Sequence, residues 1–477
     1  MQTSIHVIQA ADCAQIHERS LKLLQDTGVQ VMSDRARKIL AEGGAQVDAQ
    51  LQRVRFPRAL VEESLRLAPR RFKLGGRRPG SDLEMNVGEC RLLADGGAVS
   101  VLDWKTGDLR PGTFDDWLSA TKLIDALDEI GVYWRMVEGG FPDTDMGYVD
   151  YWRSLLNNCS KHIQDSVESV DRAQQLLEIL GIVFGGRENV RRTRPFSYVL
   201  CPMSPLVIDS AYTDAWLQTI GWDIPVAIMP MPLMGATAPA SLLSTMLVAN
   251  ADFLAALCLV QTASPGSPVI YAPVPQAVEP HTWRYTGGAI ESALLGAAVT
   301  SMGRHYGLPV EAATAGTDQY YPGAQAAYER ALNWALPTLS WPDILVGPGL
   351  FGGSTILCLE QLILDVEVFR RCVRLHRGIL TDDDLWLDHL IRQLGPGANF
   401  VGQKSTLEAL HNGRFYLSNI GFHGTHEEWK SQGMPDVLDQ LPDIMRGLLQ
   451  NHQPLPLDPA VDRELQRLAS RTRDADH

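Results

Sequence analysis

The chain alternates short apolar runs with helical patterns over most of its length, and this rhythm restricts the fold more than any other feature. Segments whose apolar residues recur at helical spacing separate the runs. Parallel strands joined by helices in this way form either a closed barrel or a doubly wound open sheet. The predicted strands lie at residues 132–138, 162–167, 196–201, 225–231, 268–273, 309–315, 344–348 and 399–403.

The number of repeats favours the barrel. About eight strand–helix units lie within about 300 residues, and a TIM (β/α)8 barrel has eight such units in typically ~250 residues. An open sheet usually has fewer strands, and a dinucleotide-binding sheet carries Gly-x-Gly-x-x-Gly after its first strand, a motif that is missing there. We predict an α/β protein with an N-terminal α+β extension at residues 1–112, a barrel at 113–404 and a helical tail at 405–477 packed on the barrel.

Composition excludes several classes of partner. The formal net charge of −14 argues against binding to nucleic acid or to an anionic membrane surface. The 7 cysteines form no Cys-x-x-Cys pair, which indicates a reducing compartment and no bound metal. The N-terminus does not resemble a signal peptide, and polar residues interrupt the most apolar stretch, 242–262. We therefore expect a cytoplasmic protein without a membrane span.

Active sites of TIM barrels lie at the carboxyl ends of the strands, so the predicted strands select the candidate residues. The segment 316–321, Gly-Thr-Asp-Gln-Tyr-Tyr, follows one such strand and attracts the most interest. The candidate substrate-binding residues at these ends are Glu138, Phe141, Asp165, Trp283, Tyr285, Asp318, Tyr320, Tyr321, Phe351 and Lys404.

These candidates combine aromatic rings with carboxylates. Aromatic faces and carboxylates together attract a cation, and a quaternary ammonium is the usual guest of an aromatic cage. Each residue also has a structural alternative, since tyrosines anchor loops and acids cap helices. Asp318 in particular is a cation partner, a base, or a charge placed near the N-terminus of the helix that begins by Pro322.

Several longer motifs carry a resemblance to a known family. Residues 229–240, which run into 247–252, are similar to the trimethylamine methyltransferase superfamily. The same holds for residues 265–271, 323–329, 359–367 and 399–402, for the later 427–429, and for 17–29 near the N-terminus. The resemblance covers essentially the whole chain.

The resemblance implies a TIM barrel that transfers methyl groups from methylated amines to a corrinoid (cobalamin) carried by a separate protein. That corrinoid protein would dock over the barrel mouth, facing Met231, Met234, Gly235, Gly316 and Gly349. Founding members of the family carry pyrrolysine at a position that falls within 316–321, where this chain has standard residues. Members without pyrrolysine look like demethylases of quaternary amines such as glycine betaine.

Three readings of function follow. The first is a corrinoid-dependent quaternary-amine methyltransferase that forms a homo-oligomer, with a trimethylamine-type demethylase as its variant. The second is a non-catalytic binder of methylated amines. The third is an unrelated barrel enzyme in which Asp165 or Glu138 acts as acid or base, which requires a perturbed carboxylate beside a nucleophile or a lysine.

Overall fold

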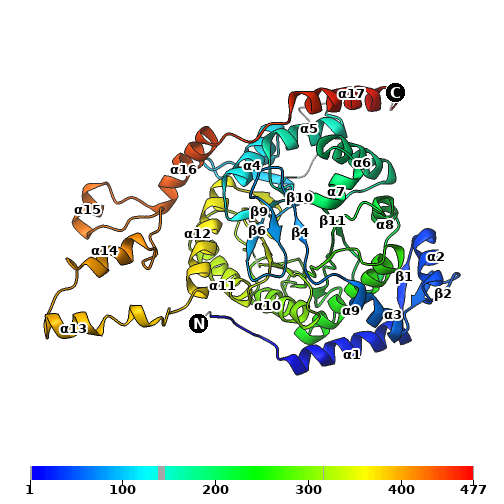
Figure 1. Ribbon diagram of the computed structural model, residues 1–477, viewed down its shortest axis with the longest axis horizontal. Helices are drawn as coiled ribbons and strands as arrows, with labels where there is room; N and C mark the ends of the chain where they lie inside the picture. The colour runs from blue at the N-terminus through cyan, green and yellow to red at the C-terminus, as the bar shows by residue number, and fades with distance from the viewer. Residues whose placement is uncertain (1–2, 138–145, 315, 476–477) are drawn as a thin grey trace.

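A closed barrel of parallel strands forms the centre of the molecule (Figure 1). The computed structural model describes residues 3–137, 146–314 and 316–475. Hydrogen-bonded strands follow the order β15-β13-β11-β10-β9-β6-β18-β17, and a parallel bridge between Tyr271 and Val310 joins the two ends of this order. The barrel strands are β6 (Arg91–Leu93), β9 (Ile130–Tyr133), β10 (His162–Asp165), β11 (Phe196–Leu200), β13 (Val226–Ile228), β15 (Val269–Tyr271), β17 (Glu311–Ala313) and β18 (Ile344–Val346).

Helices surround the barrel and follow its strands in turn (Figure 1). They are α4 (Phe114–Ala126), α5 (Tyr148–Asn158), α6 (Val170–Phe184), α8 (Ala211–Trp216), α9 (Leu242–Ala263), α10 (Ile290–His305), α11 (Ala324–Ser340) and α12 (Leu359–His376). The short helix α7 (Arg187–Thr193) follows α6, and the 3₁₀ turn η1 (Leu217–Thr219) extends α8. The predicted TIM (β/α)8 barrel is therefore confirmed.

One predicted strand is wrong. Residues 399–403 form a turn that leads into α14 (Lys404–His411), and they pair with no described strand. Phe400 and Val401 are the apolar pair that prompted the prediction, yet both are exposed. The eighth strand is β6, which lies inside the range predicted for the extension. We assigned this strand-like stretch to the extension because a hairpin, β7 (Ser100–Leu102) and β8 (Leu109–Pro111), comes between β6 and α4.

The rest of the N-terminal segment packs around the barrel. Helices α1 (Ala10–Asp26), α2 (Asp34–Glu42) and α3 (Arg58–Leu67) lie against α9. A small sheet joins β1 (Val29–Val31), β2 (Gln46–Asp48) and β3 (Arg53–Arg55) to β12 (Val207–Ile208). This packing explains α9, which is long and apolar enough to cross a membrane but has 83% of its most apolar window buried inside the protein. The three-part division of the chain stays a prediction.

Side chains fill the barrel rather than leaving a pore. Residues alternate along each strand, so Leu93, Val199 and Ile270 point inward while their neighbours face the helices. The same inner cluster includes Leu74 and Met85, which lie in or beside the hairpin of β4 (Lys73–Leu74) and β5 (Leu83–Glu84). This hairpin closes the N-terminal end of the barrel, so a ligand reaches the interior from the carboxyl end.

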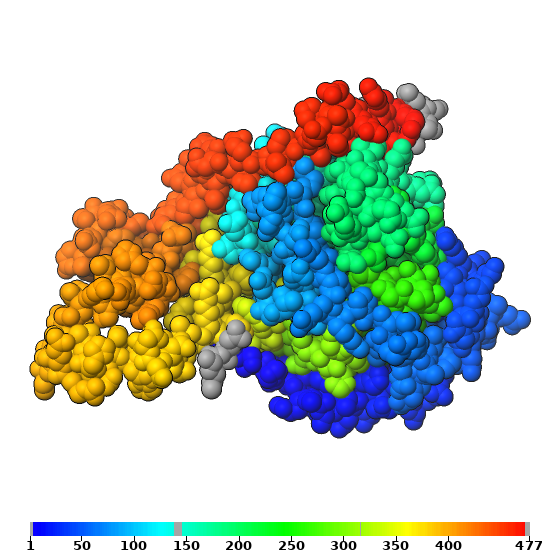
Figure 2. Space-filling model, viewed as in Figure 1, coloured from blue at the N-terminus to red at the C-terminus, as the bar shows by residue number. Residues whose placement is uncertain are grey.

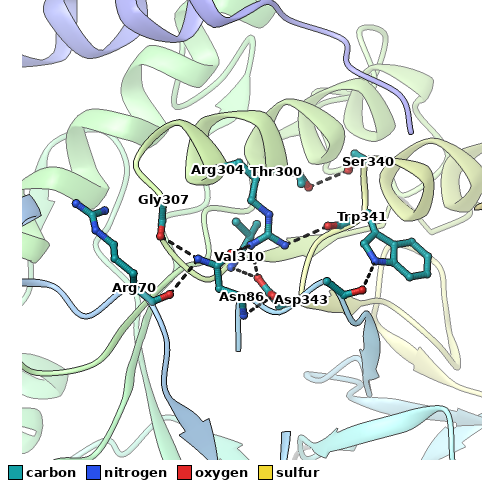
Figure 3. Close-up of polar contacts among 10 residues, drawn as sticks. Arg70, Asn86, Thr300, Arg304, Gly307, Val310, Ser340, Trp341 and Asp343 are labelled. Atoms are coloured by element: carbon teal, nitrogen blue, oxygen red, sulfur yellow. Dashed lines mark hydrogen bonds and ion pairs between the residues drawn. The ribbon is translucent and has the colours of Figure 1, made fainter. Parts of the chain in front are cut away.

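An ion pair ties several elements together at the N-terminal end (Figure 3). Asp343, just before β18, accepts hydrogen bonds from the Arg304 side chain at 2.7 Å and from the backbone amides of Val310 and Asn86 at 2.8 and 2.7 Å. Arg304, in the last turn of α10, also donates to the Asn86 side chain at 2.7 Å. The contacts link α10, β17, β18 and the segment before β6.

Candidate functional site

A chain of polar side chains crosses the barrel interior. His162 Nε2 lies 2.9 Å from Ser197 Oγ, which donates to Gln164 Oε1 at 2.9 Å. The amide nitrogen of Gln164 then donates to both carboxylate oxygens of Glu311 at 2.9 Å. His162 Nδ1 lies 3.1 Å from the carbonyl oxygen of Gly75. The four side chains are buried, so these bonds meet the requirement that buried polar groups be paired.

Burial shifts the ionisation of both ends of this chain. Desolvation raises the pKa of Glu311 from an ordinary value of 4.5 to about 7, although the Gln164 hydrogen bond acts in the opposite direction. Desolvation also lowers the pKa of His162 to about 4, so its ring is neutral near pH 7. Glu311 is therefore a barrel-interior group whose charge changes near neutral pH.

Asp318 organises the loop that follows β17. Its carboxylate accepts hydrogen bonds from the Thr286 hydroxyl and, at 2.8 Å, from the Gly287 backbone amide. Both donors belong to the loop that precedes α10. Its own backbone amide donates to Glu329 of α11 at 3.2 Å, and Glu329 also accepts from Thr317 at 2.5 Å. Asp318 therefore joins two mouth loops, a role that none of its three sequence-based alternatives described.

A second carboxylate, Asp95, follows β6 on the same side of the mouth. Ser354 Oγ donates to it at 2.6 Å, and the Gly96 amide donates at 2.9 Å. Burial raises the pKa of Asp95 to about 6, against the lowering effect of these hydrogen bonds. Ser354 also hydrogen-bonds Tyr285, whose pKa burial raises. Asp95, Ser354 and Tyr285 thus form a connected group.

Two adjacent glycines let aromatic rings approach this group. A Cβ atom on Gly353 would lie 2.8 Å from the ring of Tyr285, and one on Gly352 would lie 3.2 Å from the ring of Tyr320. Both glycines have a positive φ, 56° at Gly352 and 63° at Gly353, a backbone conformation in which other residues are strained. The mouth cluster, as we name it, consists of Asp95, Tyr285, Asp318, Tyr320 and Ser354.

Other predicted residues lie beside this cluster or on the rim. Tyr321 stacks on Trp104, with ring centroids 6.0 Å apart, and Tyr320 is 58% exposed. Trp283 is exposed on the loop before α10, and its ring would lie 3.6 Å from a Cβ atom on Gly235. Met231 is exposed, while Met234 in β14 (Leu233–Met234) and Gly316 are half-buried.

The remaining predicted residues are apart from the mouth cluster. Asp165 ends β10 and is buried, with Arg135 at 3.8 Å, and Glu138 and Phe141 lie outside the described residues. Phe351 in β19 (Leu350–Phe351) is fully buried, and it packs with β20 (Ile356–Leu357) in a small core cluster. Gly349 is also buried, and its amide donates to Asp365 at 2.8 Å.

Lys404 requires a correction. It begins α14, its side chain is 90% exposed, and it pairs with Glu408 one turn later. Because residues 399–403 are not a barrel strand, no strand end brings Lys404 to the mouth. Within the described residues, no group of three or more His, Cys, Asp or Glu side chains has the arrangement of a metal site.

Comparison with known proteins decides the family. The family model described as "Trimethylamine methyltransferase (MTTB)" matches residues 2–476. The chain belongs to this family. A trimethylamine methyltransferase (MttB) of Desulfitobacterium hafniense is 28% identical over 96% of this chain and 92% of its own length. A glycine betaine methyltransferase from the same species is 26% identical over 94% of both chains.

A solved structure shows a weaker likeness. The monomethylamine methyltransferase (MtmB) of Methanosarcina barkeri is 14% identical to this MTTB-family chain, with a TM-score of 0.49 and coverage of 92% of each chain. Membership of the MTTB family itself supports a methyl-transfer role, because curated relatives across nearly the whole chain are methyltransferases.

Sequence reasoning missed some residues of the candidate site. Asp95 was overlooked because it follows β6, which was assigned to the extension. Glu311 was read as part of an apolar run, although a lone acid inside a buried strand is a signal in itself. Gln276 in β16 (Gln276–Ala277), by contrast, follows the predicted strand 268–273, and its buried Oε1 has no hydrogen-bond partner in the described structure.

Proposed function

We propose that this protein transfers a methyl group from a quaternary amine, such as glycine betaine, to a corrinoid supplied by a separate protein. The mouth cluster is the observation that carries the proposal. It places the ring of Tyr285 near two carboxylates, Asp95 and Asp318, at the open end of the barrel, with the ring of Tyr320 beside the adjacent Gly352. Aromatic faces and carboxylates together select a cation without requiring a hydrogen-bond donor on it.

A quaternary amine suits this cluster chemically. Its nitrogen already bears a positive charge, so the attached methyl carbon is electrophilic and a neutral tertiary amine leaves with the bonding electron pair. A reduced corrinoid, when bound, supplies the nucleophile that accepts the methyl group. The protein then has to hold the cation, orient one methyl group towards the opening and exclude water. No general acid or base is required.

The rim of the barrel fits the docking of a corrinoid-carrying partner. Met203, Met231 and Trp283 are exposed there, at 49%, 47% and 66% of their surface. They lie on loops that follow β11, β13 and β15, next to the opening. Large apolar side chains in such positions are typical of protein interaction sites. This rim supports the assignment of Met231, Met234 and Gly235 to the corrinoid side.

The test is a methyl-transfer assay with defined components. The purified protein is mixed with reduced cobalamin, with or without a candidate corrinoid protein, and with trimethylamine, glycine betaine, proline betaine or carnitine in separate reactions. We expect methylcobalamin absorbance and the matching tertiary amine only with a quaternary substrate. Activity with trimethylamine alone would favour the trimethylamine-type demethylase over the quaternary-amine methyltransferase. Binding of a methylated amine without any methyl transfer would make the protein a binder.

The Asp95→Asn variant tests the role of the mouth cluster. Loss of a carboxylate near a bound cation is expected to weaken glycine betaine binding by roughly 10- to 100-fold at pH 7.5. The pKa of about 6 means that wild-type affinity falls as Asp95 takes up a proton below that pH, and the variant lacks this dependence. Isothermal titration at pH 5.5, 6.5 and 7.5 measures both effects.

A matched control separates this effect from a general change of charge. The Asp26→Asn variant makes the same chemical change at an exposed position at the end of α1. Its affinity for glycine betaine is expected to equal that of the wild type at every pH. Equal affinity of Asp95→Asn and wild type would remove Asp95 from the cation site.

A further inference from the structure

A protruding segment, residues 378–420, leaves the barrel wall after α12. We call this segment the arm. It contains the 3₁₀ turn η2 (Asp383–Leu385) and the helices α13 (Asp388–Leu394) and α14. The chain then returns through α15 (His426–Ser431) and α16 (Val437–Asn451), which packs on α4 and α12, to α17 (Pro459–Ala475) on α5 and α6. The arm stands out from the body of the molecule as a separate lobe (Figure 2).

The arm is apolar but has almost no core of its own. None of residues 378–419 is buried, and ten of its large hydrophobic side chains are exposed. Trp386, Ile391 and Val401 are among them, at 68%, 58% and 80%. Several line a groove of about 490 Å³ between α13 and α14. Isolated helices of 7 and 8 residues are not stable in water, so this surface requires a partner to cover it.

The base of the arm borders a cleft of about 580 Å³ with a basic wall. Arg91, Arg370, Arg374 and Arg377 line it, against two carboxylates, Glu89 and Glu129. Arg370 pairs with Glu129 at 2.6 Å, and Arg91 lies 3.6 Å from Glu89. No carboxylate among the described residues forms an ion pair with Arg374 or Arg377. The cleft therefore carries two arginines, Arg374 and Arg377, whose positive charge no described carboxylate pairs with.

The arm carries the opposite charge near its start. Three consecutive aspartates, Asp382 to Asp384, are exposed to solvent. None of them forms an ion pair within the described part of the chain. Together with the apolar groove they provide the complement of the cleft. An apolar arm with an acidic start and a basic cleft on one chain are self-complementary, which is the property that a two-fold symmetric interface requires.

The position of the cleft argues against the corrinoid protein as the occupant. Gly88 and Arg91 lie at the start of β6, and Trp341 and His376 lie at the ends of α11 and α12. These points mark the N-terminal end of the barrel, opposite the mouth. A partner that must reach the mouth has no reason to cover this end, whereas a second copy seated here leaves both mouths open.

We propose that two copies of this chain exchange arms, each arm lying against the basic cleft of the other copy. The apolar face of α13, with Trp386 and Ile391, supplies the buried centre of the interface. The aspartates at 382–384 face Arg374 and Arg377 of the second copy at its rim. This proposal stands apart from the proposed methyl transfer, because it uses no residue of the mouth.

Sedimentation velocity at protein concentrations from 1 to 50 μM tests the proposal. The wild type is expected to sediment as a dimer, or an even-numbered assembly, of the 52.6 kDa chain. Trp386→Glu or Ile391→Glu is expected to raise the dimer dissociation constant at least about 100-fold, as for central anchor residues of interfaces. Leu243→Glu, at a 58% exposed position on α9, is the matched control and is expected to leave it unchanged.

Charge reversal provides a test that does not depend on the apolar variants folding well. Arg377→Glu in one preparation, and Asp383→Lys with Asp384→Lys in another, are each expected to be monomeric at 1 μM. An equimolar mixture is expected to form a heterodimer, because each arm then meets a cleft of opposite charge. A monomeric wild type at 50 μM, an undisturbed dimer in Ile391→Glu, or a mixture that stays monomeric would overturn the proposal.

Discussion

The Asp365→Ala variant is expected to lose about 3–5 kcal/mol of unfolding free energy, because it leaves a buried guanidinium unpaired. Asp365 and Arg330 are both almost inaccessible and form an ion pair at 2.6 Å. Asp365 also accepts hydrogen bonds from Gly349 and Gln361, each at 2.8 Å. The pair therefore joins α11 and α12 to the loop after β18. Urea unfolding at pH 7.5 measures the loss.

Burial raises the pKa of Asp365 despite the nearby Arg330, which indicates that desolvation outweighs the pairing. A double variant, Arg330→Met with Asp365→Leu, is therefore expected to recover most of the stability, since an apolar pair avoids the desolvation cost. Asp443→Ala removes an exposed pair with Arg446 and is expected to show no measurable change. Equal losses in the single and double variants would contradict this account.

The Glu311→Gln variant is expected to be more stable than the wild type by about 3 kcal/mol at pH 8. The folded-state pKa of Glu311 is about 7 and its ordinary value is 4.5, so the folded protein holds a proton that the unfolded chain releases in this window. Wild-type stability therefore falls as the pH rises from about 4.5 to about 7. Glutamine has no proton to lose, and its amide oxygen still accepts from Gln164.

Urea unfolding at pH 5, 7 and 8 follows this effect, and the gain of the variant is expected to grow across the series. Glu42→Gln, an exposed change of the same kind at the end of α2, is expected to show no growth. A gain of equal size at all three pH values would show that packing, not ionisation, separates Glu311→Gln from the wild type. Ionisation of Glu311 would then not be the cause of the lower stability of the wild type.

The architecture was predictable because the repeating unit is long and regular. Seven of the barrel strands carry apolar runs that helices follow, and the period of the pattern changes from two to about 3.6 at each junction. The first strand, β6, was not predictable in this way, because a hairpin rather than a helix follows it. The exposed pair Phe400 and Val401 took its place, since a short apolar run does not reveal whether a neighbouring strand exists.

The candidate site was predictable only in part, and for the same reason. The strand-end rule selected Tyr285, Asp318 and Tyr320, which the structure gathers around Gly352 and Gly353. It missed Asp95 because that residue follows the misassigned strand. Which side chains share a hydrogen bond across the barrel, as Gln164 and Glu311 do, depends on strand register that no local pattern encodes.

The hairpin of β4 and β5 has a kinetic consequence. Because it closes the N-terminal end, with Leu74 and Met85 packed into the barrel, reactants and products share the entrance at the carboxyl end. Under the proposed function, a docked corrinoid protein would cover that entrance. The amine would then have to enter before its partner arrives, and the demethylated product would have to wait for its departure. Under the proposed function, the closed N-terminal end would thereby impose a compulsory order of binding and release.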